Sequence, residues 1–210
     1  MSDQTRLDRR QALKAIAITG VAGYAISRTG IAQAAACEGD GTPLQFIPKT
    51  KADPEPLKDE LTKYPKCPYC GMDRKQYHHS RHLVHYADDL VDGTCSLHCA
   101  AISLAINLDR GPKAIYAADF GSTADPKPLV NVDQATYLIG SKLPGVMTAK
   151  SKKAFASGEA AAAAMKEHGG ELGNFDAALA AAYASMAADT SMIRKKRAEK
   201  RAKAMEEKKN

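Results

Sequence analysis

The residues of this chain that could do chemistry gather between positions 67 and 99. This stretch holds four of the five cysteines, Cys67, Cys70, Cys95 and Cys99, and five of the six histidines. Thiolates, thioethers and imidazoles are the ligands that soft and borderline metals such as Cu(I) and Zn(II) prefer. The stretch therefore predicts a metal site, and the open questions are which metal it holds and whether that metal is handed on.

The spacing of the cysteines suits a four-thiolate site. Cys67 and Cys70 form a Cys-x2-Cys pair, followed by a glycine that lets the backbone turn round a metal. Cys95 and Cys99 are four residues apart at the expected start of a helix, so both thiols share one face and the helix dipole favours their thiolates. Such a site fits Zn(II) as a closed structural centre, and it also fits Cu(I), which needs only two or three thiolates. Met72, two residues after Cys70, favours Cu(I).

Two other uses of the thiols compete with metal binding. The four cysteines could form two disulfides in an exported protein. Residues 67–70 also read Cys-Pro-Tyr-Cys, the active-site tetrapeptide of glutaredoxins, which favours thiol–disulfide exchange. The glutaredoxin fold needs a strand before this motif and an amphipathic helix after it, and here a proline-rich segment precedes it and a polar run follows. No Ser-His-Asp order, phosphate-binding loop or paired-carboxylate signature stands out, so we expect a protein that is not an enzyme.

The histidines at 78, 79, 82 and 85 are less specific. Residues 81–86 alternate and are rich in strand formers, so His82 and His85 should face opposite sides of a strand. The four imidazoles therefore cannot all converge on one metal, although one of them is a candidate third ligand for Cu(I).

The surrounding pattern predicts an α+β fold with a small antiparallel sheet and a few helices. Strands are expected at 81–86, 114–118 and 136–139, with a further short strand from Val146. A turn is expected at Asp92-Gly93, followed by a helix capped by Thr94 that runs over 95–108. Two more helices are expected, over 159–168 and from Phe175 into the C-terminal tail.

The N-terminal residues 1–36 resemble a twin-arginine signal peptide. Arg9-Arg10 precede an apolar run over 15–26 that is too short to span a bilayer comfortably, and small residues follow at 32–36. Such signals export folded proteins, so a thiol site could assemble before it meets an oxidising compartment. We therefore expect a periplasmic location. Cys37, directly after this segment, is a candidate site of lipid attachment.

The remaining boundaries follow from composition and charge. Residues 37–63 are rich in proline and predict an extended tether, residues 64–190 form the predicted metal-binding domain, and residues 191–210 form a charged helical tail. The net charge of +6 is terminal: residues 1–36 carry +3 and residues 192–210 carry +6, which leaves −3 between them. The body is mildly acidic, so we expect no nucleic-acid partner. The basic tail is either a solvated helix end or a contact for anionic lipid or an acidic partner.

Over residues 64–175 the chain resembles the NosL family, periplasmic copper-binding accessory proteins of nitrous oxide reductase maturation. The matching segments are 67–72, 88–90, 133–141, 144–147, 154–155 and 168–172. The resemblance implies an α+β domain that binds one Cu(I) through thiolate and thioether ligands and delivers it to a partner. On the family pattern, Cys70 and Met72 fall on a Cys-x-Met motif and Met147 falls on a downstream methionine.

The cysteine-rich stretch also resembles the small YHS/TRASH metal-binding module. The pair Cys95/Cys99 departs from the simplest NosL pattern, and it would either add a zinc-like structural centre or make the copper site all-thiolate. Our leading hypothesis is an exported Cu(I) chaperone for a copper enzyme such as nitrous oxide reductase. The alternatives are a zinc-stabilised four-cysteine binding module without metal transfer, and a thiol–disulfide oxidoreductase.

Overall fold

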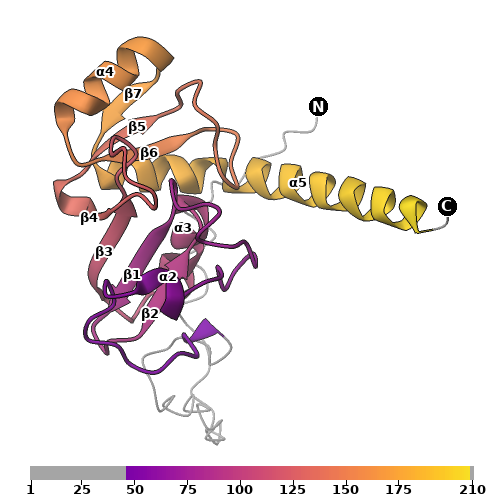
Figure 1. Cartoon of the computed structure of the whole chain (residues 1–210), viewed down its shortest axis with the longest axis horizontal. Helices are drawn as coiled ribbons and strands as arrows, with labels where there is room; N and C mark the ends of the chain where they lie inside the picture. The colour runs from indigo at the N-terminus through magenta and orange to yellow at the C-terminus, as the bar shows by residue number, and fades with distance from the viewer. Residues whose placement is uncertain (1–45, 209–210) are drawn as a thin grey trace, which may run out of the picture. The chain divides into compact units, whose positions relative to one another are not determined.

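The structure is a computed structural model that describes residues 46–208, which belong to one compact unit spanning residues 38–210. The predicted signal peptide and Cys37 lie outside the described residues. In chain order the elements are α2 (Glu60–Lys63), β1 (His82–Tyr86), β2 (Val91–Thr94), α3 (Leu97–Ile106), β3 (Pro112–Ala118), β4 (Leu129–Asn131), η2 (Val132–Gln134), β5 (Thr136–Ile139), β6 (Lys152–Phe155), α4 (Gly158–His168), β7 (Glu171–Gly173) and α5 (Phe175–Glu207) (Figure 1). Between residues 46 and 208, no helix has the length and apolar character needed to cross a membrane.

The first sheet carries the predicted metal-binding region. It is antiparallel, with the strand order β2-β1-β3-β4, and all five residues of its inner strand β1 are buried. Helix α3 packs against β1 and β2, which places the first turn of that helix beside the sheet. The strand predicted from the alternation along 81–86 is therefore buried on both faces, and His82 and His85 are buried along with its apolar residues.

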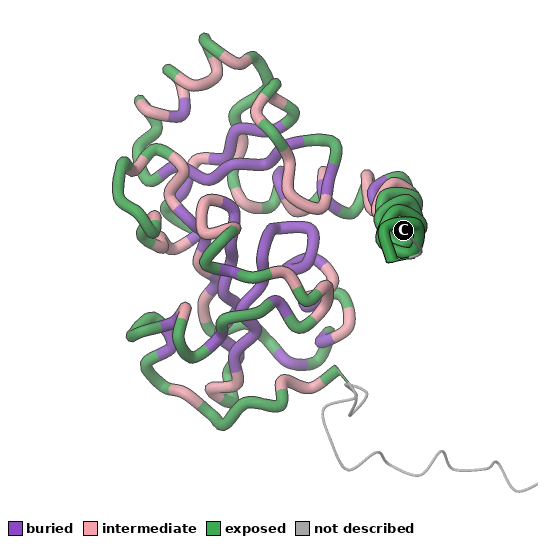
Figure 2. The backbone as a smooth tube through the Cα atoms, turned by 45° about the vertical axis from the view of Figure 1, so that its right-hand side comes forward, coloured by how far each residue is buried: buried purple, intermediate pink, exposed green. Residues whose placement is uncertain are grey.

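The second sheet has three antiparallel strands in the order β6-β5-β7, and α4 packs against all three of them. The contacts that join the sheets include a hydrogen bond from the Phe120 amide to the Ala154 carbonyl at 2.7 Å and an approach of the His82 ring to the Tyr137 hydroxyl at 3.1 Å. Apolar side chains from both sheets, α3 and α5 form one core, and the buried stretches of the chain meet there (Figure 2).

The α+β class is confirmed, and the predicted strands at 81–86, 114–118 and 136–139 are present within a residue or two. The sequence did not indicate a second sheet. Strands β4 and β7 are three residues long, too short to show a period of two. Strand β6 contains Lys152 and Lys153, both buried, so it reads as polar. The short strand expected from Val146 is not formed.

The turn predicted at Asp92-Gly93 is wrong, because both residues lie inside β2. The hairpin instead turns at residues 87–90, where Asp89 adopts a left-handed conformation with φ of 60°. Gly93 is required for a different reason: a Cβ there would lie 2.8 Å from Cζ of Arg74. Helix α3 also begins two residues later than expected, with Ser96 rather than Thr94 in the N-cap position.

The Arg74 guanidinium that fills this space is completely buried. It forms an ion pair with Glu60 at 2.7 Å and donates to the carbonyl oxygens of Tyr64 at 2.6 Å, Thr94 at 3.3 Å and His82 at 3.3 Å. These acceptors belong to α2, the chain after it, β2 and β1. One side chain therefore ties the segment that carries the first cysteine pair to the sheet beside the second pair.

Replacing Arg74 by Met should destabilise the protein strongly, because it leaves the buried Glu60 carboxylate with fewer partners and frees three backbone acceptors. We expect the free energy of unfolding, measured by urea denaturation, to fall by about 3–5 kcal/mol. The matched control is Lys75→Met, at the exposed neighbouring position, which should stay within about 0.5 kcal/mol of the parent. Equal effects of the two changes would contradict this role for Arg74.

The His82 ring makes the stability dependent on pH. Its Nδ1 lies 3.0 Å from the Ser80 carbonyl, which can only accept, so Nδ1 carries the proton and Nε2 accepts from the Tyr137 hydroxyl. Burial of this neutral ring lowers the pKa of His82 to about 4. The unfolded chain, with an imidazole pKa of about 6.5, therefore takes up a proton before the native protein does.

From this we expect native stability to be unaffected by His82 above about pH 6.5 and to fall by about 3 kcal/mol as the pH drops from about 6.5 to about 4. Urea midpoints measured across this range for the parent and for His82→Gln would test it. The variant should start less stable and should show a shallower loss with acid. Parallel pH profiles for the two proteins would show that another group is responsible.

Candidate metal centre

The first cysteine pair lies on a tight hairpin of residues 66–73, which we call the knuckle. The Cys67 amide donates to the Met72 carbonyl at 2.9 Å, and the Gly71 amide donates back to the Cys67 carbonyl at 2.8 Å. Gly71 has a φ of 75°, the left-handed conformation that glycine adopts without strain, and no atom would touch a Cβ there. The left-handed backbone conformation, rather than a lack of space for a side chain, therefore explains why glycine suits position 71. The turn directs the Cys67 and Cys70 side chains toward the same centre.

The second pair lies at the start of α3. Cys99 is in the first turn of this helix, and Cys95 lies just before the N-cap residue Ser96. The Ser80 hydroxyl donates to the Cys95 carbonyl at 2.8 Å and so fixes the entry into the helix. The two sulfur atoms are 3.8 Å apart.

The four sulfur atoms converge as their spacing predicts. All lie within 4.8 Å of one another, and the Cys70 and Cys95 sulfur atoms are 3.3 Å apart. Ligands of a tetrahedral zinc–thiolate centre with bonds of about 2.3 Å would lie roughly 3.8 Å apart, so small shifts would complete such a site. All four thiols are free, which contradicts the alternative of two disulfides. Cys67, Cys95 and Cys99 are buried, and Cys70 alone is partly exposed.

The four thiols do not ionise equally, because each one hydrogen-bonds to its neighbours. Hydrogen bonds from Cys70, Cys95 and Cys99 lower the pKa of Cys67. The same bonds raise the pKa of Cys95 and Cys99, because each of these thiols donates toward Cys67. Cys67 raises the pKa of Cys70, and hydrogen bonds from Cys95 and Cys99 outweigh this and lower it. A cation placed among the sulfur atoms would allow the remaining protons to leave, as metal binding to thiols requires.

Two thioethers contact the thiol cluster. Met72 from the knuckle and Met147 from the loop before β6 both pack against it, and both are partly exposed. The structure therefore brings together the six residues predicted from the sequence, the four cysteines, Met72 and Met147. Their action as ligands stays a prediction. Of these six residues, Cys70, Met72 and Met147 are the partly exposed ones, and we call these three the open edge.

The Met147 backbone adopts a left-handed conformation with φ of 59°, which costs a non-glycine residue about 1–2 kcal/mol. Its loop is held on both sides. A Cβ on Gly145 would lie 2.3 Å from the Thr148 carbonyl oxygen, so only glycine fits that tight turn. The Ala149 amide donates at 3.0 Å to the carboxylate of Asp189, a buried residue of α5. Helix α5 therefore helps to position the methionine against the thiols.

The knuckle is anchored by a second buried network. Tyr69 donates a hydrogen bond to Asp92 of β2, and the Ser103 hydroxyl of α3 donates to the same carboxylate oxygen at 2.6 Å. The Tyr86 hydroxyl lies 2.5 Å from the Ser103 hydroxyl. Burial raises the pKa of Asp92, and the hydrogen bonds from Ser103 and Tyr69 oppose this rise. This network fixes the orientation of the residues between the first two cysteines.

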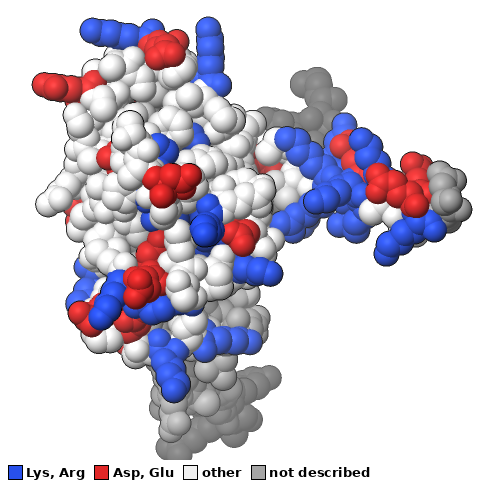
Figure 3. Space-filling model, in the orientation of Figure 1, with Lys and Arg blue, Asp and Glu red and all other residues white. Residues whose placement is uncertain are grey.

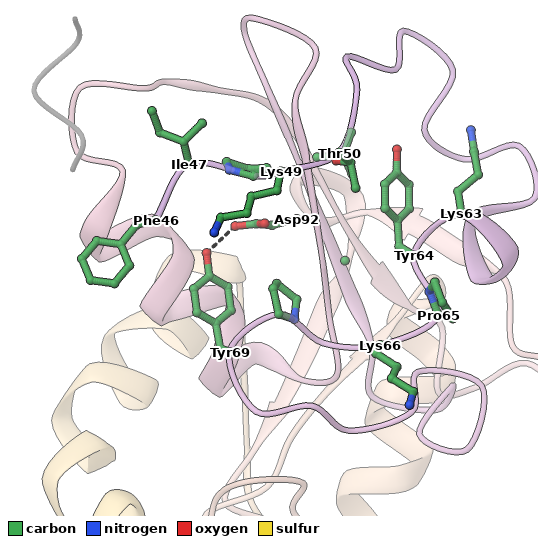
Figure 4. A pocket seen from close by; sticks show the side chains of 14 residues that line it. Phe46, Ile47, Lys49, Thr50, Lys63, Tyr64, Pro65, Lys66, Tyr69 and Asp92 are labelled. Carbon is green, nitrogen blue, oxygen red and sulfur yellow. Dashed lines mark hydrogen bonds between the residues drawn. The ribbon is translucent and has the colours of Figure 1, made fainter. Parts of the chain in front are cut away.

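A groove of about 740 Å³ runs beside Tyr69 and Asp92 (Figure 4). Residues 46–50 of the predicted tether line one part of it, and Pro68 and Tyr69 of the knuckle line another. No cysteine lines the groove, so it is separate from the open edge.

The histidines do not join the thiol cluster, in agreement with the expectation that they could not all converge. His82 bonds Ser80 and Tyr137, and His85 lies 2.8 Å from Asp89. His78 accepts from the Lys127 amide at 3.1 Å. Within the described part of the chain, the only group of side chains arranged to hold a metal contains no histidine.

Several residues that position the site were not identified from the sequence: Arg74, Asp92, Ser103 and Asp189. Each is a polar residue whose partners are distant in the sequence, so spacing alone does not reveal it. The one available signal was the position of Arg74, two residues after the Cys-x-Met segment and among residues that otherwise read as a polar loop.

Comparisons with known proteins identify the family of the chain. The NosL family profile matches residues 58–182. Among solved structures, the crystal structure of the copper chaperone NosL from Shewanella denitrificans is similar, with a TM-score of 0.45 and 23% sequence identity, over 53% of this chain and 87% of that chain. No curated protein matches the chain. The profile covers more than half of the sequence, including all four clustered cysteines and both methionines. The chain therefore belongs to the NosL family.

Proposed function

We propose that this protein is an exported Cu(I) chaperone that delivers copper to a maturing copper enzyme such as nitrous oxide reductase. The observation that carries the proposal is the open edge. Two partly exposed thioethers, Met72 and Met147, pack against a set of buried thiols, and a fourth thiol of the set, Cys70, is partly exposed as well. Thioether and thiolate ligands together favour Cu(I) over harder cations.

The open edge suits transfer better than permanent storage. A structural zinc centre is closed and uses all four ligands. Here Cys70, Met72 and Met147 are partly exposed, so a thiol of an acceptor could reach a bound ion from that side. In this ligand exchange, the bond between copper and the Cys70 sulfur would break as a bond between copper and the acceptor thiolate forms. Copper would stay as Cu(I), and no electron would be transferred.

The same cluster supports a second candidate function, a zinc-stabilised binding module. Three of the four thiols are buried and all four sulfur atoms lie at distances close to those of a tetrahedral centre, which is the arrangement of a structural zinc site. In that case the metal would contribute folding free energy and would not be handed on.

Export by the twin-arginine route fits either metal, since it would carry the folded and metallated protein into an oxidising compartment. The predicted signal in residues 1–36 supports a periplasmic location, and Cys37 would provide attachment to the membrane.

The double replacement Met72→Leu and Met147→Leu separates the two functions, because Leu keeps the volume and removes the thioether sulfur. We expect Cu(I) affinity, measured by competition with a chromophoric chelator under anaerobic conditions, to fall at least about tenfold, or ~1.4 kcal/mol. Zinc content should be unchanged. The matched control is the double replacement Met165→Leu and Met205→Leu. Met165 packs against the apolar cluster between α4 and the second sheet, and Met205 is exposed, so neither belongs to the thiol cluster. Unchanged copper affinity in the first variant would remove the thioethers from the proposal.

Single serine variants test the division between the open edge and the buried thiols. Cys70→Ser should leave the urea midpoint near that of the parent and abolish copper transfer to apo nitrous oxide reductase, followed by the visible absorption of its copper centres. Cys99→Ser, at a fully buried position, should lower the midpoint of the metal-loaded protein. Zinc that remains tightly bound in Cys70→Ser, with unfolding on addition of a chelator and no copper transfer by the parent, would instead establish the structural module.

A further inference from the structure

The last part of α5 is an exposed, strongly basic helix. Every residue from 194 to 208 is exposed, and this stretch contains eight basic and three acidic residues, a net charge of +5. The last buried residue of the helix is Asp189. The C-terminal part of α5 protrudes from the domain in Figure 1. A helix this charged, without an apolar face packed on the domain, gains little from folding back on its own protein.

The three arginines of this stretch share one face. Arg194, Arg197 and Arg201 follow the spacing i, i+3, i+7, and we call them the arginine face. None of them has an acidic residue three or four positions away. Among residues 46–208, no ion pair is formed by any of the three.

The lysines of the stretch are arranged differently. Lys196, Lys200 and Lys203 follow the spacing i, i+4, i+7 on another face, and this side also carries the glutamates. Lys203, for example, has Glu199 four positions before it and Glu207 four positions after it. The helix therefore balances part of its charge on the lysine side and leaves the arginine face unneutralised.

The arginine face lies next to the open edge. The Arg197 guanidinium donates to the Cys70 carbonyl at 3.1 Å, so it reaches the residue whose thiol is the accessible one. Lys66 and Lys75, at either end of the knuckle, add exposed positive charge, and the nearby Asp73 carboxylate accepts from the Gln76 amide. Blue side chains of the protruding helix gather toward the body of the domain in Figure 3. The Arg197 guanidinium therefore lies at the residue that carries the accessible thiol, and two exposed lysines flank the knuckle in the sequence.

We propose that the arginine face is the docking surface for an acidic protein that receives the metal. The inference rests on the proposed function, because the docking is what would bring an acceptor's thiols to Cys70. Arginine suits this role, since its guanidinium binds carboxylates in a bidentate geometry, which lysine cannot. An acidic surface paired with these arginines would both speed the encounter and fix its orientation.

A membrane surface fits the helix less well. Helices that lie in a lipid interface bury a broad apolar face, and between 194 and 208 Met205 is the single large apolar side chain. Lipid headgroups would also be attracted to both sides of the helix, whereas the charge is left unneutralised on the arginine side.

The test is the rate of Cu(I) transfer from the loaded full chain to two synthetic acceptor peptides. Both carry the same Cys-x2-Cys site, flanked in one peptide by glutamates and in the other by glutamines, and their copper affinities are matched beforehand. The parent should transfer faster to the glutamate peptide, with a rate that falls as salt is added. The triple variant Arg194→Gln, Arg197→Gln, Arg201→Gln should transfer to it about tenfold more slowly.

The matched control removes three charges from the same helix, as Lys196→Gln, Lys200→Gln, Lys203→Gln, and should change the rate less than about twofold. Helix content by circular dichroism and copper stoichiometry should be the same in all three proteins. Equal loss of rate in the two triple variants would overturn the proposal in favour of diffuse attraction. Unchanged transfer together with lost binding to phosphatidylglycerol vesicles would overturn it in favour of a lipid surface.

Copper binding by the parent is measured separately from transfer. If the parent binds no copper, the proposed function fails and this inference falls with it. If copper binds and moves to both peptides at the same rate, the chaperone function stands and the acidic docking surface is overturned.

Discussion

The geometry of the site depends on one buried cation. Arg74 is charged and fully enclosed, and such a group is tolerated only where its donors are all used. Its guanidinium uses the Glu60 carboxylate and backbone carbonyls from three separate segments. Arg81 shares the same carboxylate at 2.7 Å, so two buried cations are tied to one anion. The knuckle therefore cannot move away from the sheet without exposing or orphaning charge.

The thiol cluster, by contrast, concentrates groups that can become negatively charged. Four sulfur atoms within 4.8 Å cannot all be ionised without a cation, and the raised pKa of Cys95 and Cys99, with the lowered pKa of Cys67, expresses that competition. A soft cation resolves it by replacing thiol protons. The protein thus holds the four sulfur atoms close together through contacts outside the cluster.

Helix α5 links the two sides of the open edge. Asp189 accepts from Ala149 and so holds the loop of Met147, while two turns later Arg197 reaches the carbonyl of Cys70. The Tyr183 hydroxyl also donates to the Ala101 carbonyl of α3, at 3.0 Å, which fixes the helix against the element that carries Cys99. A movement of α5 would therefore displace the loop of Met147, the backbone of Cys70 and α3 together.

The sequence by itself determined the ligand types, the two cysteine pairs and most of the regular elements, because these depend on spacing and on local periodicity. It also indicated Met147, through a family pattern rather than through any physical signal. It placed a turn at Asp92-Gly93, where the tertiary structure has a strand whose glycine makes room for Arg74. The tertiary structure alone decided that Met72 and Met147 pack against one thiol cluster, and that an arginine 127 positions after Cys70 reaches the carbonyl of that cysteine. The physical reason is that these contacts depend on how the sheets and α5 pack, and packing joins residues whose separation in the sequence carries no periodic signal.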